Sequence, residues 1–566
     1  MKKLKKLTCA LLALTTLAGS VGLVACGGGA KIVNDGKTVN IRMLKAGYGE
    51  DFIYELKSKF EAAYKDEGYK MNILEPSSDM RGDTALQEMA RGNSATGIDL
   101  YIIGNVTVDQ VGKDGEYGIV AEDIRELVHN QRAIGYDGKE EEKTVDEKLS
   151  ADIDPFIEDS NGVLYGFNWS QSTAGLVVNT RKLAKYGITE LPKTTNEMFE
   201  TFETIYMGAN GVANSEESTT FPVTYVSGTN GYTACAFWTW LAQYDYQGFK
   251  EFMSMKKDGV DMLEDGYEVF NTQGVQEMLT LAYRSMDQRI AAYGSTTQTL
   301  DQAQAKMMKD RNDAVFMFNG DWMLNEVKLN YRNYIGDIEF INTPLNSALG
   351  EKLFCKAPYN LNEARADELL SLIAGMVDER KSLDEIISAA QTEMNVTLSE
   401  EDAQEVATAR GTIYTRGVEH IAYITKGSPN KELAALVLRM MASDDFAETF
   451  SQYANTATPY ATIENLSNDN KFVQEAFAIT TNPYVRSITN TLYGLRKQVL
   501  TAQLPGVNHI ASTIYQQNVS MYDGKGGKIE NVGVEVYENA AKTMKTTAYN
   551  TAKDSWETWL KNAGLK

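Results

Sequence analysis

Histidine and cysteine are scarce in this chain, and together they give no metal-binding pattern. The 566 residues include three histidines, which lie far apart in the sequence. No HExxH motif occurs, and no group of cysteines and histidines has the spacing of a zinc site. After Cys26 only Cys235 and Cys355 follow. One disulfide is therefore possible, but a fold that depends on a disulfide framework is excluded.

The sequence also lacks the common motifs of nucleotide binding and of serine nucleophiles. It has no GxSxG elbow, no P-loop and no complete EF-hand loop. Gly47 and Gly49 follow the first predicted strand without the third glycine of a dinucleotide fingerprint. These absences predict no cofactor, no metal and no catalytic residue. Carboxylates are abundant, so a glycosidase-like pair of them remains an alternative.

Basic residues are outnumbered, with 55 Lys and Arg against 77 Asp and Glu, and the formal net charge is −22. Removal of residues 1–25, which hold four lysines and no acidic residue, would bring that charge to about −26. A strongly acidic chain repels the phosphates of nucleic acids and the surface of anionic membranes. We therefore predict no nucleic-acid partner, and the composition suits a protein that works outside the cytoplasm.

The N-terminal segment combines a basic start, an apolar run and a cysteine. Four lysines flank the start of the run Leu7–Val24, and Cys26 follows the run and precedes three glycines. The pattern resembles a bacterial lipoprotein signal, in which residues 1–25 are removed and lipid is attached to the cysteine. It predicts a protein anchored by lipid on Cys26 at the extracytoplasmic face of the cell membrane, with residues 26–37 as a tether. The alternative is a membrane-spanning anchor, for which the run is at the short limit.

Beyond this leader, 541 residues remain, which is too many for one hydrophobic core, so two or more domains are expected. The first part alternates strand-like segments at 39–44, 71–74 and 98–103 with helix-like segments at 52–60 and 84–91. This order predicts an open, mostly parallel sheet with helices on both faces. Such sheets bind ligands beyond the carboxyl ends of their strands.

A second α/β series begins near residue 163. Its strand-like segments lie at 174–178, 221–226, 313–318 and 336–341. Ser428-Pro429-Asn430 predicts a helix that has its proline at the first helical position and runs to Met441. Residues 361–416 are rich in Glu, Asp, Ala and Leu and predict two or three amphipathic helices. We interpret them as a helical insertion packed on its host lobe, the alternative being an arm that docks a partner.

Three groups of segments resemble the signatures of one protein family. They comprise residues 165–169 (YGFNW), 174–181 (AGLVVNTR) and 191–194 (LPKT), then 314–322 (AVFMFNGDW), and then 428–434 (SPNKELA) with the stretch that ends near 460. In this order, and with the lipoprotein start, they resemble the extracellular solute-binding proteins of ABC importers, in the maltose- and oligosaccharide-binding branch (family 1). The insertion and the long C-terminal tail depart from the compact family pattern.

The resemblance implies a two-lobed α/β fold of the periplasmic-binding-protein type (type II), with hinge crossovers and the ligand between the lobes. The crossings are expected near residues 165–170, 341–344 and 453–459. Lobe 1 would then hold residues 38–168 and 342–452, including the insertion at 361–416. Lobe 2 would hold residues 169–341 and 453–566.

A sugar presents apolar C–H faces edged by hydroxyl groups, so its site needs aromatic rings together with charged or amide groups. The resemblance implies that Trp322 stacks on the sugar and that Asp321 beside it accepts hydroxyl protons. It also implies that Asp79 and Arg81, after the second strand, contact the hydroxyls. The alternatives are that Trp322 packs against the start of a helix and that Asp79 and Arg81 form an ion pair at a helix cap.

The remaining candidates are three tryptophans and two polar residues. Asn168 and Trp169 lie at the expected first crossing, where the tryptophan stacks on the ligand or packs. Glu50 follows the first strand in a loop that faces the cleft in the family, with a helix cap there as the alternative. Trp238 and Trp240 share one segment at a spacing more typical of a core.

The resemblance thus implies a monomeric substrate-binding protein of an ABC importer that is not an enzyme. It would capture a carbohydrate, in particular an oligosaccharide, between its lobes and deliver it to the permease subunits in the membrane. The alternatives are an extracellular polysaccharide-degrading enzyme, a binding protein of the same fold for a non-sugar solute, and a sensor or adhesin subunit.

Overall fold

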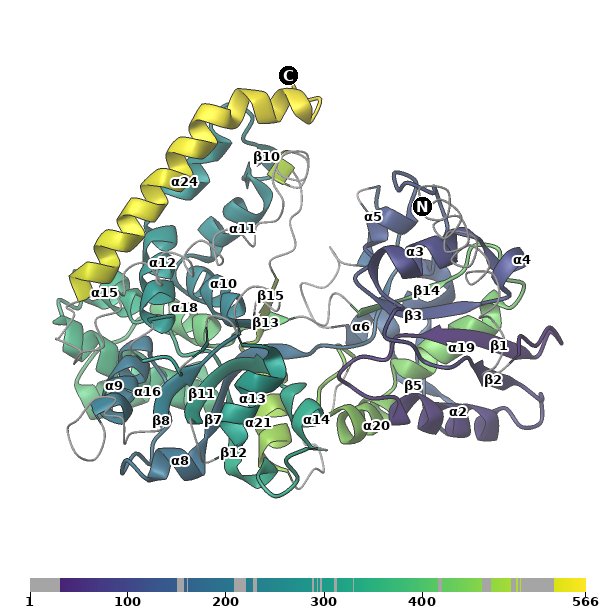
Figure 1. Ribbon diagram of the computed structural model, residues 1–566, viewed down its shortest axis with the longest axis horizontal. Coiled ribbons are helices and arrows are strands. Elements are labelled where there is room, and N and C mark those ends of the chain that lie inside the picture. The colour runs from purple at the N-terminus through teal and green to yellow at the C-terminus, as the bar shows by residue number, and fades with distance from the viewer. Residues whose placement is uncertain are drawn as a thin grey trace, which may run out of the picture.

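The structure, a computed structural model, describes most of the chain beyond residue 30. The described residues are 31–149, 157–159, 161–207, 220–226, 232–287, 290–292, 294–295, 298–309, 313–328, 330–415, 420–460, 470–489, 495–496, 499 and 534–566. They form two α/β lobes, one around each of two mixed sheets (Figure 1). The two-lobed α/β fold predicted from the sequence is therefore confirmed.

Lobe 1 is built on a sheet with the strand order β2-β1-β3-β14-β6. Its first three strands, β1 (Thr38–Met43), β2 (Lys70–Ile73) and β3 (Leu100–Gly104), pair in parallel. Two strands from later in the chain, β14 (His420–Ile424) and β6 (Phe167–Asn168), add to it antiparallel. The sheet is therefore parallel among β1, β2 and β3, which follow one another in β-α-β units, and antiparallel where the later strands join it.

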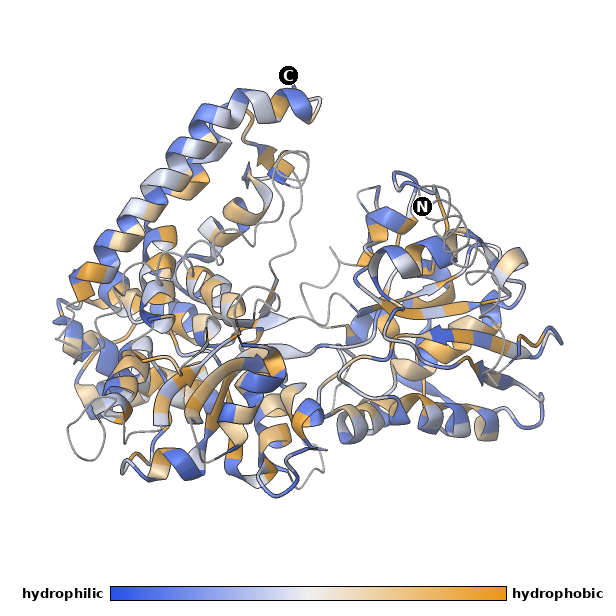
Figure 2. Cartoon of the chain, in the orientation of Figure 1, coloured by the Kyte–Doolittle hydropathy of each residue, from blue (hydrophilic) through white to orange (hydrophobic). Residues whose placement is uncertain are grey.

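The longer helices cover this sheet because each of them presents one apolar side to the core. In α2 (Asp51–Ala63) the side chains of Phe52, Leu56 and Phe60 lie four residues apart and are fully buried. The other helical segments are α3 (Gly82–Ala90), α4 (Asn93–Thr96), α5 (Val108–Val111), a π-helix at Arg125–His129, α6 (Val145–Lys148), α19 (Lys431–Met441) and α20 (Asp444–Ala454). The outer side of α2 is largely hydrophilic (Figure 2). A small hairpin of β4 (Arg132–Ile134) and β5 (Glu140–Thr144) completes the lobe.

Lobe 2 is built around β7 (Thr173–Asn179), whose seven residues are all buried. On one side β7 pairs with β11 (Asp313–Gly320), which pairs with β8 (Thr220–Thr224). On the other side it pairs with β12 (Ile338–Ile341) and with β13 (Thr412–Thr415), next to β15 (Arg486–Ile488). The flanking helical segments are α8 (Thr180–Ala184), α9 (Thr195–Met207), α10 (Tyr232–Tyr244), α11 (Tyr246–Ser254), η2 (Gly266–Asn271), α12 (Gln273–Ser285), α13 (Leu300–Met308), α14 (Met323–Val327), η3 (Ile335–Asp337), α15 (Ala348–Phe354) and α21 (Lys471–Thr480).

The long C-terminal helix α24 (Val534–Asn562) lies along the outside of lobe 2, on α12 and η2 (Figure 1). Its Trp556 is buried and donates a hydrogen bond from the indole nitrogen to the carbonyl of Leu263 at 2.7 Å, beyond the hairpin of β9 (Lys256–Lys257) and β10 (Val260–Asp261). The tail therefore adds a layer to lobe 2 and does not extend lobe 1.

The chain passes between the sheets in three places. It leaves lobe 1 after β6 and enters lobe 2 at β7, so the first crossing comprises residues 169–172. It returns between β13 and β14, through residues 416–419, which lie outside the described residues. It leaves lobe 1 again after α20, through residues 455–460, before α21 packs on β12.

The second crossing was expected near 341–344, and this prediction is wrong. After β12 the chain stays with lobe 2, because Leu345 bridges to Thr194 and the indole nitrogen of Trp240 donates to the carbonyl of Pro344 at 3.0 Å. Strand β13 then pairs with β7 in the same sheet. Residues 342–415 thus belong to lobe 2 and not to lobe 1.

The helical insertion folds as three helices, α16 (Glu363–Asp378), α17 (Leu383–Met394) and α18 (Glu400–Arg410). They enclose an apolar cluster of their own with α15. Lobe 2 holds them through side-chain hydrogen bonds from Thr194 to Asp367 at 3.0 Å and from Ser371 to Glu197 at 2.5 Å. The host of this insertion is therefore lobe 2, where the sequence analysis had placed it on lobe 1.

The N-terminal expectations are tested only in part. The leader, the apolar run and Cys26 lie outside the described residues, and within the described part no helix has the length and hydropathy needed to cross a bilayer. The second half of the expected tether is bound to lobe 1. Val33 exchanges two hydrogen bonds with the side chain of Asn40 at 3.0 and 2.8 Å, and the carbonyl of Lys31 accepts from Asn72 at 2.9 Å.

Candidate functional site between the lobes

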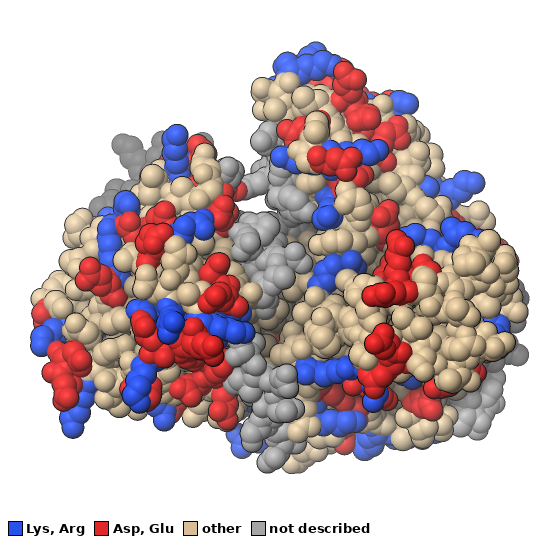
Figure 3. Space-filling view, turned by 180° about the vertical axis from the view of Figure 1, so that it is seen from behind, with Lys and Arg blue, Asp and Glu red and all other residues tan. Residues whose placement is uncertain are grey.

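A pocket of about 220 Å³ lies between the two lobes. Lobe 1 contributes Leu44, Ala46, Gly47, Tyr48, Arg81, Asn105 and His420, and lobe 2 contributes Tyr232, Trp322 and Glu326. The lobe 1 groups follow the carboxyl ends of β1, β2 and β3, which is where an open α/β sheet binds its ligands. On the face shown in Figure 3, basic and acidic side chains are interspersed over both lobes.

Trp322 forms the aromatic wall on the lobe 2 side. It follows β11 directly, and its ring folds back over Gly320, where an added Cβ would lie 2.1 Å from the ring. Glycine is therefore required at position 320. The indole lies 5.2 Å from the ring of Tyr232, and its buried N–H has no hydrogen-bond acceptor within the described part of the chain. A ligand oxygen in the pocket can satisfy that N–H.

Glu326 adds a carboxyl group to the same wall. It stands four residues after Trp322, so both side chains project from the same side of α14. One carboxylate oxygen accepts a hydrogen bond from the side-chain amide of Gln304. Burial, and to a lesser extent the nearby charge of Asp301, raises the pKa of Glu326 to about 7. At neutral pH the group therefore exists in both protonation states and can accept or donate to a hydroxyl.

The opposite wall, in lobe 1, adds exposed polar groups to the buried side chains of Leu44 and Tyr48. Arg81 is exposed, and its Nε donates to the carbonyl of Ser78 at 3.0 Å. Asn105 follows β3 with φ of 56°, a left-handed conformation that asparagine tolerates better than most residues. Arginine and amide groups are the donors that hold sugar hydroxyls.

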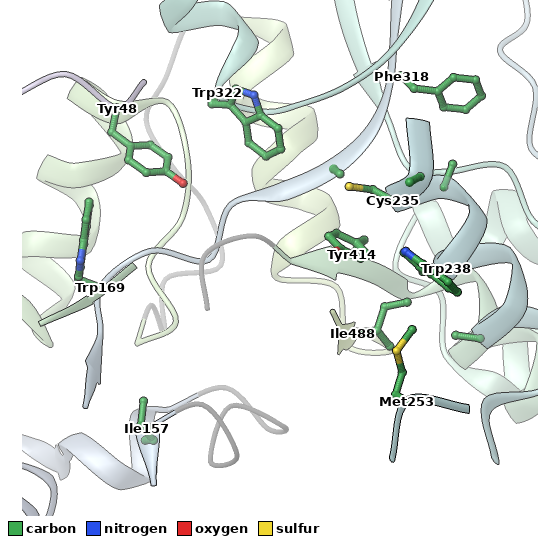
Figure 4. Packing of buried hydrophobic residues seen from close by; sticks show 14 of the residues in the cluster. Tyr48, Ile157, Trp169, Cys235, Trp238, Met253, Phe318, Trp322, Tyr414 and Ile488 are labelled. Carbon is green, nitrogen blue, oxygen red and sulfur yellow. The ribbon is translucent and has the colours of Figure 1, made fainter. Parts of the chain in front are cut away.

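Tyr48 connects this wall to the first crossing. Its hydroxyl donates to the Ser172 hydroxyl at 2.7 Å, and its ring lies 5.1 Å from that of His420 and 5.6 Å from that of Trp169. Figure 4 shows Tyr48 and Trp322 projecting from opposite sides of the gap between the lobes. The pocket therefore borders directly on the hinge.

Asp321 is not among the residues that line the pocket. Its side chain is fully buried, and its Oδ2 accepts hydrogen bonds from the amide of Thr173 at 3.2 Å and from the hydroxyl of Thr456. Burial raises the pKa of Asp321 to about 7. The structure thus places this carboxyl between the start of β7 and the third crossing, away from the position expected for a group that contacts sugar hydroxyls.

Trp169 and Asn168 are packed inside lobe 1. Trp169 is 1% exposed and lies against Phe52, Phe450 and His420, at ring distances of 5.9, 6.0 and 5.2 Å. Asn168 is fully buried in β6 and donates to the carbonyl of His420 at 3.2 Å. Trp169 therefore packs in an aromatic core and is not among the residues that line the pocket.

The other predicted site residues lie away from the pocket lining. Trp238 and Trp240 are buried in α10, where Trp238 packs on Phe252 at 5.7 Å. Glu50 occupies the N-cap position of α2 without a capping side-chain hydrogen bond, and it forms an ion pair with Lys45 at 3.3 Å. Asp79 is exposed on the loop after β2 and has no ion pair among the described residues. Of the nine predicted ligand-binding residues, the pocket brings together Trp322 and Arg81.

The sequence analysis missed most of the lining. A signal was present for two residues. Asn105 directly follows the third predicted strand, and Glu326 is spaced four residues from Trp322. Tyr232, Tyr48 and His420 come from distant parts of the chain and carried no local signal.

Neither a metal centre nor a disulfide lies in the described part of the chain. No group of three or more potential ligands among the histidines, cysteines and carboxylates of those residues comes together. Cys235 is buried and Cys355 is partly exposed, and no disulfide joins them.

The chain thus has two α/β lobes, three crossings and a pocket between the lobes, an arrangement shared with solved structures of solute-binding proteins. No protein-family model matches the chain, and no curated protein matches it. Solved structures of this class do match. The chain is similar to an ABC-transporter solute-binding protein from Thermotoga lettingae bound to α-D-tagatose, with 12% identity and a TM-score of 0.51 over 91% of this chain and 100% of the other.

Two further structures give the same result. The protein RafE in complex with raffinose is 10% identical, with a TM-score of 0.51 over 91% of this chain and 99% of RafE. A secreted solute-binding lipoprotein from Streptomyces coelicolor is 12% identical, with a TM-score of 0.50 over 92% and 100% of the two chains. At these identities the likeness establishes the fold, which is that of ABC-transporter solute-binding proteins.

Proposed function

We propose that the protein belongs to the family 1 solute-binding proteins and captures a carbohydrate between its lobes for an ABC importer. The observation that carries the proposal is the pocket itself. It sets the aromatic wall of Trp322 and Tyr232 in lobe 2 against Arg81 and Asn105 in lobe 1. Rings suit the C–H faces of a sugar, and the polar groups suit its hydroxyls. A ligand that contacts both walls stabilises the closed arrangement of the lobes.

No catalytic role is needed for this function. A glycosidase requires two carboxyl groups flanking the scissile bond. Among the described residues that line the pocket, Glu326 is the only carboxylate. This supports a binding protein over the alternative of a polysaccharide-degrading enzyme. Release of reducing ends from polysaccharides by the purified protein would contradict the proposal.

Attachment to the membrane and delivery to a permease complete the proposal. Lipid on Cys26 would hold a monomer at the extracytoplasmic face, and the closed form would dock on the permease subunits. Lys31 and Val33 are hydrogen-bonded to lobe 1, so this part of the expected tether would not serve as a flexible spacer. Loss of membrane attachment in a Cys26→Ala variant tests the anchor.

Calorimetric titration of the protein is the decisive test of the ligand class. The panel comprises raffinose, D-tagatose, D-galactose and maltotriose, with amino acids and short peptides as a second arm. We expect binding of at least one sugar, accompanied by a smaller radius of gyration in X-ray scattering as the lobes close. Binding of an amino acid or peptide and of no sugar would replace the ligand class.

A zwitterionic solute is the second candidate, because one observation favours it. Arg81 and Glu326 line the same pocket from opposite lobes, and opposite charges in that arrangement match a carboxylate and an ammonium group. The same titration separates the candidates. The aromatic wall favours the sugar, since an amino acid with a small side chain makes little use of two adjacent rings.

A further inference from the structure

Residues 321–326, at the end of β11 and the start of α14, have two distinct contact faces. Trp322 and Glu326, four residues apart, line the pocket. Asp321 and Asn325, also four residues apart, contact the crossing segments. Residues four apart share one side of a helical turn, so the segment presents one side to the pocket and the other to the hinge.

Asp321 links the start of β7 to the third crossing. Its Oδ2 accepts hydrogen bonds from the amide of Thr173, the first residue of β7, and from the hydroxyl of Thr456 in the third crossing. The backbone amide of Asp321 also donates to the carbonyl of Thr173 at 3.1 Å, which continues the pairing of β11 with β7. A fully buried carboxyl with such partners fixes the third crossing to the residue that precedes Trp322.

Asn325 adds two contacts with the start of the third crossing. Its side-chain amide donates to the carbonyl of Ala454, and its carbonyl oxygen accepts from the side chain of Asn455. Asn455 ends α20 in a left-handed conformation, with φ of 54°, at the point where the chain leaves lobe 1. Asn325 therefore attaches α14 to the last turn of a lobe 1 helix.

We propose that Asp321 and Asn325 are positioning residues that couple the pocket face of residues 321–326 to the third crossing and to the start of β7, where the first crossing ends. When the lobes move, the dihedral angles of the crossings change, and these contacts transmit the change to Trp322 and Glu326. Ligand contact with Trp322 and lobe closure are then one coupled event. The coupling to ligand rests on the proposed function, and the coupling to the hinge does not.

Hydrogen–deuterium exchange tests the hinge coupling without any ligand. The variants are Asp321→Ala and the milder Thr456→Val, which removes one hydroxyl that does not line the pocket. We expect exchange of the peptides covering 170–174 and 320–327 to rise about tenfold in both variants. Thr456→Ser, which keeps the hydroxyl, should restore protection.

The matched control is Glu475→Ala. Glu475 is a largely buried carboxyl of lobe 2 that also accepts from a backbone amide, that of Phe340 at 2.9 Å, and lies outside the pocket between the lobes. This variant should leave exchange at 170–174 and 320–327 unchanged. Unchanged exchange of residues 320–327 in Thr456→Val would overturn the proposal, as would an equal rise in the control.

A double-mutant cycle on sugar affinity tests the coupling to ligand. Affinities for whichever of raffinose, D-tagatose, D-galactose and maltotriose binds are measured for the wild type, Thr456→Val, Trp322→Ala and the double variant. We expect the fold-loss of affinity in the double variant to be smaller than the product of the fold-losses in the two single variants, by a factor of at least about three. Strictly multiplicative losses would overturn this coupling. If no sugar binds the wild type, the proposed function fails, and the exchange result alone decides the hinge coupling.

Discussion

The two walls of the pocket differ in how firmly the fold holds them. In lobe 2 the wall is formed by Trp322, which is 5% exposed, packs on Tyr232 and is followed by a helical turn attached to the hinge. In lobe 1 the wall combines the buried side chains of Leu44 and Tyr48 with the exposed polar side chains of Arg81 and Asn105, which lie on loops after strands. Burial fixes the ring of Trp322 before any ligand arrives, whereas the polar side chains of lobe 1 are held less firmly.

The largest effect should come from a residue that belongs to neither wall. Trp169→Ala leaves a cavity among Phe52, Phe450 and Tyr48, and we expect it to lower the free energy of unfolding by about 3–5 kcal/mol. Urea unfolding followed by circular dichroism measures this, with Trp169→Phe as the milder control. A loss below about 1 kcal/mol, together with loss of sugar binding, would show that Trp169 contacts the ligand instead.

Removal of the buried wall should be the largest effect on binding. Trp322→Ala takes away the ring that faces the pocket, and we expect it to weaken sugar binding by about 2 kcal/mol, or about thirtyfold. Its cost to folding should stay below that of Trp169→Ala. Calorimetry and urea unfolding on the same preparations give both numbers. Unchanged affinity would mean that the indole only packs against the start of α14.

The pH dependence of stability sharpens the contrast, because the buried wall carries Glu326. Its pKa of about 7 lies above its ordinary value of 4.5, so the folded state holds this proton more tightly than the unfolded state does. Its contribution to stability is therefore complete below about pH 4.5 and is lost as pH rises toward 7. Glu326→Gln should abolish this loss. Between pH 4.5 and pH 8 the free energy of unfolding of the variant should therefore rise by about 1–3 kcal/mol relative to that of the wild type. Parallel pH profiles of the two proteins, from urea unfolding, would contradict the assignment.

The exposed polar side chains of lobe 1 should give the smallest effects. Arg81→Ala should weaken sugar binding by about 1 kcal/mol and change the free energy of unfolding by less than about 0.5 kcal/mol. Arg91→Ala, an exposed arginine at the other end of α3, is the matched control and should change neither. A loss of affinity in Asp79→Ala as large as that in Arg81→Ala would extend the site beyond the residues that line the pocket.

Local sequence patterns located most of the elements near the pocket. The alternation at 39–44 predicts β1, which the structure has at Thr38–Met43, and the pattern at 313–318 predicts β11 at Asp313–Gly320. These predictions succeed because the spacing of apolar residues along a strand reflects which side chains it buries, and that spacing can be read from neighbouring residues. The helix that ends at Met441 was also predicted, but it begins at Lys431, with Asn430 as its cap, so Pro429 is not its first residue.

Trp169 and Trp322 show where such reasoning stops. Both tryptophans stand beside a strand end, and both were candidates for stacking on the ligand. The structure encloses Trp169 in rings from α2, α20 and the loop after β1, whereas Trp322 faces the pocket with its N–H unsatisfied by the described residues. Those neighbours lie more than a hundred positions away in the sequence, so no local pattern distinguishes the two.

The sequence by itself determined the alternation of strands and helices, the two-lobed class and the presence of a helical insertion, since each depends on the period of apolar residues or on short signatures. Only the tertiary structure decided that residues 342–415 join lobe 2, because that depends on β13 pairing with β7 across more than two hundred residues. The same holds for Asp321, which contacts the hinge and not the pocket. Side chains acquire such roles from partners that the fold, and not the neighbouring sequence, brings to them.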